Sequence, residues 1–190
     1  MSDGQRQHKH GQAHESAHNP ASGKHHHRKA ANVSVTVLVV TVSDTRTLET
    51  DTGGGRVAEM LEGAGHKVHG RKIVPDEPEA IAAATREGLE ADGVEALILT
   101  GGTGVAPRDV TPESVAPLFE REIPGFGELF RMLSYEDIGS AALLSRATAG
   151  LAYGRVVFVI PGSRGAVGLA MEKLILPELG HLAAEAVKTR

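Results

Sequence analysis

Residues 33–42 read VSVTVLVVTV, a nearly unbroken run of β-branched and aliphatic side chains. A strand buried on both faces has this composition, and such strands are typical of parallel sheets covered by helices. The polar stretch SDTRTLETDTGGG follows at residues 43–55 and is rich in turn-forming residues. We therefore predict a buried parallel strand that leads at residue 43 into a polar loop.

Strand and helix patterns alternate along the rest of the chain. Further apolar runs predict strands at residues 67–74, 94–99 and 155–160. The intervening patterns predict helices at about residues 56–64, 77–91, 111–119, 126–135 and 165–188, the last one broken or kinked near Pro177. Such alternation produces right-handed βαβ units. We predict an α/β fold: a mostly parallel sheet with helices on both faces, in a three-layer, doubly wound arrangement.

The first 31 residues differ from the rest. They lack Val, Ile, Leu and aromatic residues, and they hold seven of the ten histidines: His8, His10, His14, His18, His25, His26 and His27. A segment this polar cannot bury enough apolar surface to offset the entropy of ordering it. We predict a disordered, His-rich tail at residues 1–31 and one domain at residues 32–190. The tail either binds nickel, zinc or copper or is a solvated segment without a dedicated role, because loose histidine spacing fixes no ligand geometry.

Charge and composition exclude several classes of function. The tail holds five basic and two acidic residues, whereas residues 32–190 hold 15 basic and 22 acidic ones. An acidic domain with 3% aromatic residues argues against a nucleic-acid groove and against base-stacking platforms. The absence of cysteine excludes disulfides, thiolate catalysis and cysteine-ligated metal centres. Since no apolar run reaches membrane-spanning length, we predict a cytoplasmic protein without nucleic-acid or membrane partners.

Four polar loops leave the carboxyl ends of the predicted strands. They are Ser43-Asp44, Pro75-Asp76, residues 101–109 and residues 161–163. In a mostly parallel sheet these ends meet at one edge, and ligands bind there. The topology alone therefore predicts a binding site at this edge.

The loop Gly101-Gly102-Thr103-Gly104 comes directly off the strand at residues 94–99. Glycines allow a sharp turn, tolerate positive φ and bring backbone N–H groups close to an anion, and Thr103 adds a hydroxyl. We predict that these four residues bind a phosphate or carboxylate. The alternative is a plain turn, which needs fewer glycines. The spacing matches neither the dinucleotide fingerprint nor a P-loop.

Three aspartates accompany these loops: Asp44, Asp76 and Asp109. Each has a local alternative, because aspartate is a common turn and capping residue. Two carboxylates on one sheet edge suit magnesium, which prefers one or two carboxylates together with substrate phosphates. We predict that Asp76 and Asp109 are catalytic and bind magnesium, and that Asp44 and Ser43 are further polar contacts.

Two helix starts lie near the same loops. Thr111 opens the sequence TPE and is predicted to cap one helix. Ser163 is predicted to cap another, whose N-terminus could bind an anion. For Arg164 and for Ser145-Arg146, both a phosphate contact and an ordinary surface position stay open.

Eight motifs together resemble one family. They are VSDTRT (42–47), DTGG (51–54), VPDE (74–77), LTGGTG (99–104), RDVTPE (108–113), EIPGFGELFR (122–131), SRATAG (145–150) and PGS (161–163). GGTG followed by RDVTPE and then PGFGE is far more specific than any single motif. The chain resembles the MoaB/MogA family of molybdenum cofactor biosynthesis proteins from about residue 33 to its end, and SRATAG and PGS resemble the MoaB branch.

This resemblance implies a molybdopterin-binding-like fold and a substrate, molybdopterin, which is a phosphorylated pterin dithiolene. Active members use Mg-ATP to adenylate its terminal phosphate and release pyrophosphate. By motif position, Asp76 and Asp109 resemble the family's two functional aspartates. The residues predicted to bind molybdopterin and its phosphate are Ser43, Asp44, Gly101, Gly102, Thr103, Gly104, Ser145, Pro161, Gly162 and Ser163. The resemblance also implies self-association as a trimer or a hexamer.

Two other functions compete with the adenylyltransferase. One is a binding or carrier protein that holds molybdopterin without adenylating it. The enzyme and the carrier differ in whether Asp76 and Asp109 engage Mg-ATP. The other is a generic anion-binding scaffold whose His-rich tail handles metal. The presence of both aspartates favours the enzyme.

Overall fold

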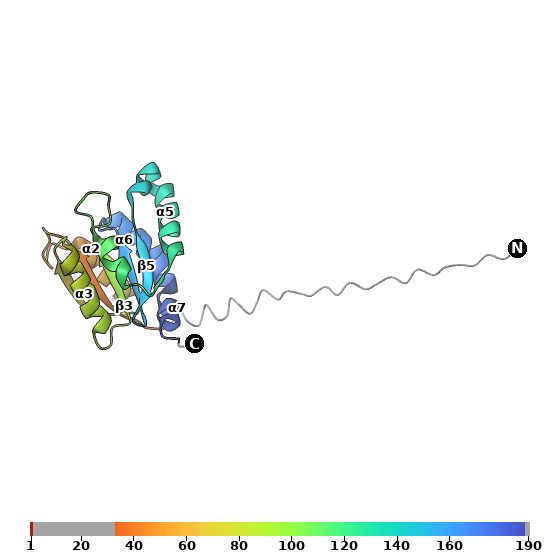
Figure 1. Cartoon of the computed structure of the whole chain (residues 1–190), viewed down its shortest axis with the longest axis horizontal. Coiled ribbons are helices and arrows are strands. Elements are labelled where there is room, and N and C mark those ends of the chain that lie inside the picture. Colours follow the sequence, from red (N-terminus) through yellow and green to blue (C-terminus); the bar gives the residue numbers. More distant parts are fainter. Residues whose placement is uncertain (2–32, 189–190) are drawn as a thin grey trace.

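The computed structural model describes residue 1 and residues 33–188 (Figure 1). Apart from Met1, the predicted tail lies outside the described residues. Within the described part, six strands form one sheet in the order β2-β1-β3-β6-β5-β4. The strands are β1 (Thr36–Val42), β2 (Lys67–Val74), β3 (Ala96–Thr100), β4 (Arg121–Glu122), β5 (Thr148–Ala152) and β6 (Arg155–Ile160).

The sheet is mostly parallel, as predicted. Strand β1 pairs in parallel with both β2 and β3, and β3 pairs in parallel with β6. Strands β5 and β4 continue the sheet in antiparallel pairs. Because β2 and β3 lie on opposite sides of β1, the chain reverses its direction of winding between β1 and β3. In open α/β sheets, ligands bind at such a switch point.

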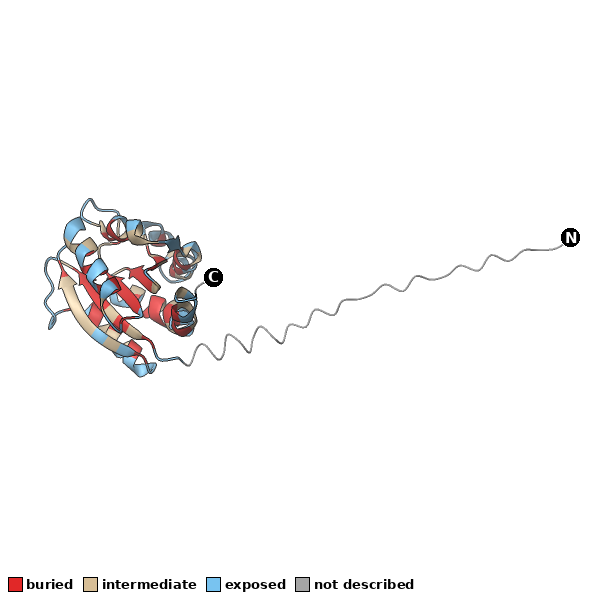
Figure 2. Cartoon of the chain, turned by 60° about the horizontal axis from the view of Figure 1, so that its bottom comes forward, coloured by how far each residue is buried: buried red, intermediate tan, exposed pale blue. Residues whose placement is uncertain are grey.

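Helices cover both faces of the sheet (Figures 1 and 2). The α-helices are α2 (Thr52–Gly63), α3 (Pro78–Glu90), α4 (Thr111–Val115), α5 (Pro124–Ile138), α6 (Arg164–Ala170) and α7 (Leu176–Ala186). Shorter helical segments are η1 (Ala116–Leu118), η2 (Gly139–Leu144) and the π-helical η3 (Met171–Ile175). The π-helical turn lies between α6 and α7, just before Pro177. This confirms the predicted break in the last helix, because π-turns and prolines are common causes of kinks.

Two hydrophobic clusters form the core, one on each face. Helices α2, α5, α6 and α7 pack on one face, and α3 and α4 pack on the other. Strand β3 divides its side chains between them: Ile98 joins the first cluster, whereas Leu97 and Leu99 join the second. All three are fully buried, and each contributes about 1.5–3 kcal/mol of apolar burial. The three-layer prediction is confirmed.

Strands β4 and β5 were not predicted. The sequence of β5, TAGLA, contains no β-branched run, so its local pattern does not indicate a strand. A tight turn at Tyr153 (φ 53°) and Gly154 (φ 71°) instead folds β5 back onto β6. Gly150 admits the ring of Phe119, since a Cβ there would lie 2.4 Å from the Phe119 Cγ. Tertiary packing therefore makes this segment a strand.

Helix α2 begins earlier than predicted, at Thr52 rather than Arg56. Asp51 is its N-cap, and the Asp51 Oδ1 accepts a hydrogen bond of 2.9 Å from the Gly54 N–H. A Cβ at Gly54 would lie 2.4 Å from both Asp51 Oδ2 and Thr41 Oγ1. The glycines predicted to extend the loop are thus required inside the helix, where it packs closely on the end of β1.

Candidate functional site

The glycine loop after β3 and the PGS loop after β6 lie against each other at the carboxyl edge of the sheet. The Gly101 N–H donates a 3.0 Å hydrogen bond to the carbonyl oxygen of Ile160. A Cβ at Gly162 would lie 3.4 Å from the Cα of Gly101. The Thr100 hydroxyl donates to the carbonyl oxygen of Pro161 at 3.3 Å. The topology therefore brings these two predicted loops together.

The conformation of the glycine loop requires its glycines. Gly101 and Gly102 have φ values of 111° and 61°, in the region that favours glycine. A Cβ at Gly101 would lie 2.3 Å from the carbonyl oxygen of Val42 at the end of β1. A Cβ at Gly104 would lie 2.6 Å from Asp109 Oδ2. The loop passes too close to its neighbours for a plain turn built from other residues.

Asp109 closes the loop on itself. Its Oδ2 accepts a 2.9 Å hydrogen bond from the Ala106 N–H, and its own N–H donates to the Ala106 carbonyl oxygen at 2.9 Å. Neither Asp109 nor Thr111 caps α4, because the N-cap is Val110, which provides no side-chain hydrogen bond. The predicted cap at Thr111 is wrong: Thr111 is the first residue inside the helix.

The carboxylates of Asp76 and Asp109 lie close enough to interact. Burial raises the pKa of Asp76, and the negative charge of Asp109 raises it further. Asp76 does not cap α3, whose N-cap is Glu77 without a side-chain hydrogen bond. Among the described residues, no group donates a hydrogen bond to the Asp76 carboxylate. The local alternative of helix capping therefore does not apply to either aspartate.

Asp44 and Ser43 hold the loop after β1. Asp44 Oδ1 accepts a hydrogen bond of 3.2 Å from the Asp76 N–H, and Asp44 Oδ2 forms an ion pair with Arg108. The Ser43 hydroxyl accepts a hydrogen bond of 3.3 Å from the Thr45 N–H. Asp44 thus joins three of the predicted loops, and its charge is already paired.

A cavity of about 200 Å³ opens beside these loops. Thr103, Ser145, Pro161 and Ser163 line it on one side, and Phe130, Ile138 and Leu144 of α5 and η2 contribute apolar surface. Ser163 Oγ caps α6, as predicted, by accepting a 3.3 Å hydrogen bond from the Ala166 N–H. The Ser145 hydroxyl is buried and has no hydrogen-bond partner among the described residues. The cavity therefore combines hydroxyl groups with an apolar wall.

Comparison with known proteins identifies the family. The family described as "Probable molybdopterin binding domain" matches residues 38–181. The chain is 52% identical over 165 residues to molybdenum cofactor biosynthesis protein B of Bacillus subtilis, covering 86% of this chain and 97% of that protein. The chain belongs to the MoaB/MogA family of molybdenum cofactor biosynthesis proteins. This confirms the resemblance drawn from the motifs.

Solved structures of MoaB proteins share the fold. A crystal structure of molybdenum cofactor biosynthesis protein B superposes with a TM-score of 0.80 at 54% identity, covering 81% of this chain and 96% of that one. The tungsten cofactor synthesizing protein MoaB from Pyrococcus furiosus superposes with a TM-score of 0.74 at 37% identity, covering 82% and 98%. The six-stranded, mostly parallel sheet described here is thus a MoaB/MogA fold.

Arg146 is a central residue of this MoaB-like site whose role the sequence left open. Its Nε donates a 2.7 Å hydrogen bond to the Gly104 carbonyl oxygen, and its guanidinium also contacts the Asp109 carbonyl oxygen and the Glu113 carboxylate. Its backbone N–H donates to the Thr103 carbonyl oxygen at 3.1 Å. Arg146 therefore braces the glycine loop. The motif SRATAG contains it, but no local pattern indicates this contact.

Asp51 is a second residue that the sequence analysis did not assign. Its Oδ2 accepts hydrogen bonds of 2.8 Å from both Thr41 Oγ1 and the Arg71 guanidinium. Burial would raise the pKa of Asp51, but the bonds from Arg71, Gly54 and Thr41 outweigh burial and hold it below its usual value. Asp51 thereby ties β1, β2 and α2 together behind the site.

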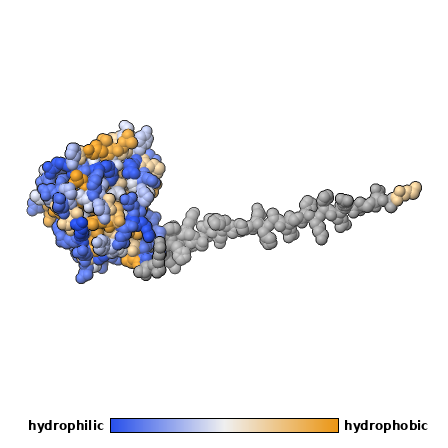
Figure 3. All heavy atoms as spheres, viewed as in Figure 1, coloured by the Kyte–Doolittle hydropathy of each residue, from blue (hydrophilic) through white to orange (hydrophobic). Residues whose placement is uncertain are grey.

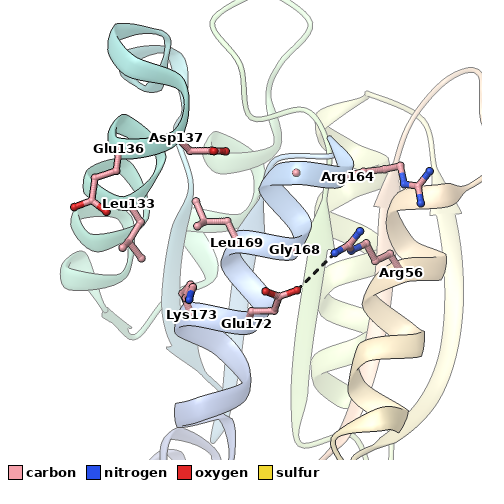
Figure 4. Close-up of a pocket in the computed structure, with 10 residues that line it drawn as sticks. Arg56, Leu133, Glu136, Asp137, Arg164, Gly168, Leu169, Glu172 and Lys173 are labelled. Carbon is pink, nitrogen blue, oxygen red and sulfur yellow. Dashed lines mark ion pairs between the residues drawn. The ribbon is translucent and has the colours of Figure 1, made fainter.

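A larger hollow of about 480 Å³ lies between α2, α5 and α6 (Figure 4). Arg164 lines it together with Arg56, Lys173 and three acidic residues, and Arg56 pairs with Glu172 at 3.6 Å. It includes no residue of the glycine loop, and its charges are of both signs. We therefore place the candidate site of this family member at the sheet edge.

The described residues contain no group of three or more His, Cys, Asp or Glu side chains that could hold a metal ion. A cation at this site would therefore rely on Asp76 and Asp109 and on oxygens from substrate or water. In residues 33–188, no helix is long and apolar enough to cross a membrane. The cytoplasmic location stays a prediction.

Proposed function

We propose that the chain binds molybdopterin at the glycine-loop edge and transfers AMP from Mg-ATP to its terminal phosphate. A molybdopterin phosphate oxygen forms a bond to the α-phosphorus of ATP, and the bond from that phosphorus to the bridging oxygen breaks, which releases pyrophosphate. This reaction needs no covalent protein intermediate. Positioning and charge neutralisation supply the catalysis, so the absence of cysteine is no obstacle. Membership of the MoaB/MogA family supports a role in molybdenum cofactor biosynthesis, and adenylyl transfer is the reaction that we propose within it.

The carboxylates of Asp76 and Asp109, which both lie beside the glycine loop, carry this proposal. Two like charges held close together raise the pKa of one of them, and a divalent cation between them relieves the repulsion. No described lysine or arginine pairs with either carboxylate. The donor set therefore fits magnesium, which neutralises phosphate charge when it is bound.

The two loops fit the phosphate. Positive φ at Gly101 and Gly102 turns the backbone sharply, so that the N–H groups after it can face an anion. The buried hydroxyl of Ser145 lacks a partner and lines the cavity beside Thr103, where a phosphate oxygen would satisfy it. The apolar wall formed by Phe130 and its neighbours suits a planar ring.

The test is direct synthesis. The full-length chain is incubated with molybdopterin and Mg-ATP, and adenylated molybdopterin and pyrophosphate are measured by mass spectrometry. We expect product from the natural sequence, a loss of at least about 100-fold in Asp76→Asn and in Asp109→Asn, and no loss in the matched control Asp92→Asn, which is exposed at a distant turn. Tight molybdopterin binding without product would refute adenylyl transfer and indicate a carrier.

We further propose that the chain associates with copies of itself as a trimer or hexamer. Figure 3 shows an apolar patch over the end of α5 and η2. Helix α5 and η2 carry six large side chains that are about half exposed or more: Leu129, Met132, Tyr135, Ile138, Leu143 and Leu144. Large apolar side chains that stay exposed on adjoining elements mark interaction surfaces. Light scattering of the natural chain and of Leu143→Lys tests this, and a monomeric natural chain would refute it.

A further inference from the structure

Thr111 is fully buried beneath the glycine loop, and its hydroxyl has no hydrogen-bond partner among the described residues. The backbone of Thr111 is held in place, because its N–H donates a 3.0 Å hydrogen bond to the Gly102 carbonyl oxygen. The hydroxyl does not serve as a helix cap, since Thr111 is already inside α4. A buried hydroxyl without a protein partner destabilises a protein, so its presence calls for an explanation.

The Asp76 carboxylate is a matching acceptor. A Cβ at Gly102 would lie 2.3 Å from Thr111 Oγ1 and 3.1 Å from Asp76 Oδ1, so both oxygens lie beside this glycine. The hydroxyl lacks an acceptor, and the carboxylate receives no hydrogen bond from any described residue. Glycine at position 102 leaves room beside both oxygens, and any side chain there would crowd the Thr111 hydroxyl.

We propose that Thr111 is a positioning residue for Asp76: its hydroxyl donates a hydrogen bond to the Asp76 carboxylate and orients it when a divalent cation occupies the Asp76–Asp109 pair. The inference rests on one part of the proposed function, the divalent cation at Asp76 and Asp109. It does not depend on adenylyl transfer. One carboxylate oxygen would then be free to hold the cation, while the other would accept the hydrogen bond from Thr111. Groups that orient a ligating carboxylate in this way typically change metal affinity by about 10- to 100-fold.

Two substitutions separate this role from a structural one. Thr111→Val keeps the shape of the side chain and removes the hydroxyl, whereas Thr111→Ser keeps the hydroxyl. A hydroxyl that stabilises the free fold would lower the melting temperature when it is removed. Removing an unpaired hydroxyl leaves the melting temperature unchanged or raises it. We therefore expect Thr111→Val without metal to melt at the same temperature or about 2–4 °C higher.

The experiment measures Mn²⁺ binding to the full-length chain by electron paramagnetic resonance, without ATP or molybdopterin. Asp76→Asn in the same full-length chain defines the background, including any binding by the N-terminal histidines. We expect the Kd of the Asp76-dependent site to rise at least about tenfold in Thr111→Val, and by clearly less than that in Thr111→Ser.

Three results would overturn the inference. They are unchanged Mn²⁺ affinity in Thr111→Val, an equal loss of affinity in Thr111→Ser, and the absence of any Asp76-dependent Mn²⁺ site in the natural chain. Failure of the proposed function is distinguishable. If Mn²⁺ binds as expected but no adenylated molybdopterin forms, adenylyl transfer is refuted and the role of Thr111 stands.

Discussion

Replacing Asp51 with alanine is expected to lower the free energy of unfolding by about 3 kcal/mol. The substitution removes the N-cap of α2, which costs about 1 kcal/mol. It also removes the acceptor for Thr41 and Arg71, each 2.8 Å away: the buried Thr41 hydroxyl is left unpaired and the partly buried Arg71 loses its ion pair, which together cost about 2 kcal/mol more. For a domain of this size, that corresponds to a melting temperature lower by about 6–12 °C.

The pH dependence tests the same reasoning. The pKa of Asp51 is lower in the folded chain than in the unfolded one, because Arg71 and the two other donors outweigh burial. Its contribution to stability is therefore complete above the unfolded pKa of about 3.9 and is lost as pH falls through the folded-state value. The stability difference between the natural chain and Asp51→Ala should accordingly shrink in acid.

The assay is thermal and urea denaturation followed by circular dichroism, at pH 7 and at several values below pH 5. Asp92→Ala is the matched control, because Asp92 is exposed and should change the melting temperature by less than about 1 °C. A fall of less than about 2 °C in Asp51→Ala at pH 7, or a difference that does not shrink in acid, would show that these bonds do not stabilise the fold as argued.

Three further predictions concern stability. Burial lowers the pKa of His66, whose neutral ring accepts a backbone hydrogen bond. The stability that the neutral ring contributes to the fold is therefore present above about pH 6.5 and is lost as pH falls through the folded-state pKa. Urea unfolding should show this pH dependence, and His66→Gln should remove it. Gly101→Ala should destabilise the chain by about 3 kcal/mol or more, because its Cβ meets the Val42 carbonyl oxygen and φ is positive; Gly63→Ala, in a helix with open space around it, should be neutral or stabilising. Calorimetry that found both glycine variants alike would contradict this. Tyr153→Asn should raise the melting temperature slightly, because asparagine tolerates φ of 53° better than tyrosine, and a lower value would contradict the turn assignment.

Several errors of the sequence analysis have one physical cause. The TAGLA segment became a strand because a hairpin places it beside β6, and the glycines after Asp51 joined α2 because they fit against β1. Thr111 carried a strong local capping signal, yet packing beneath Gly102 placed it inside the helix. In each case contacts distant in sequence outweighed a local preference of about 1 kcal/mol.

Local sequence patterns were enough to predict the fold class, the polar loops at the carboxyl ends of the strands and the family. Buried strands require continuous apolar runs, and a close-packed loop requires its glycines, so both are visible as local patterns. Which polar groups come within hydrogen-bond distance depends on the three-dimensional packing. The bracing by Arg146 and the unpaired hydroxyl of Thr111 depend on where the loop after β3 and the start of β5 lie in space. No local pattern encodes such a meeting, because hydrogen bonds and charges act across a few ångströms and not along the chain.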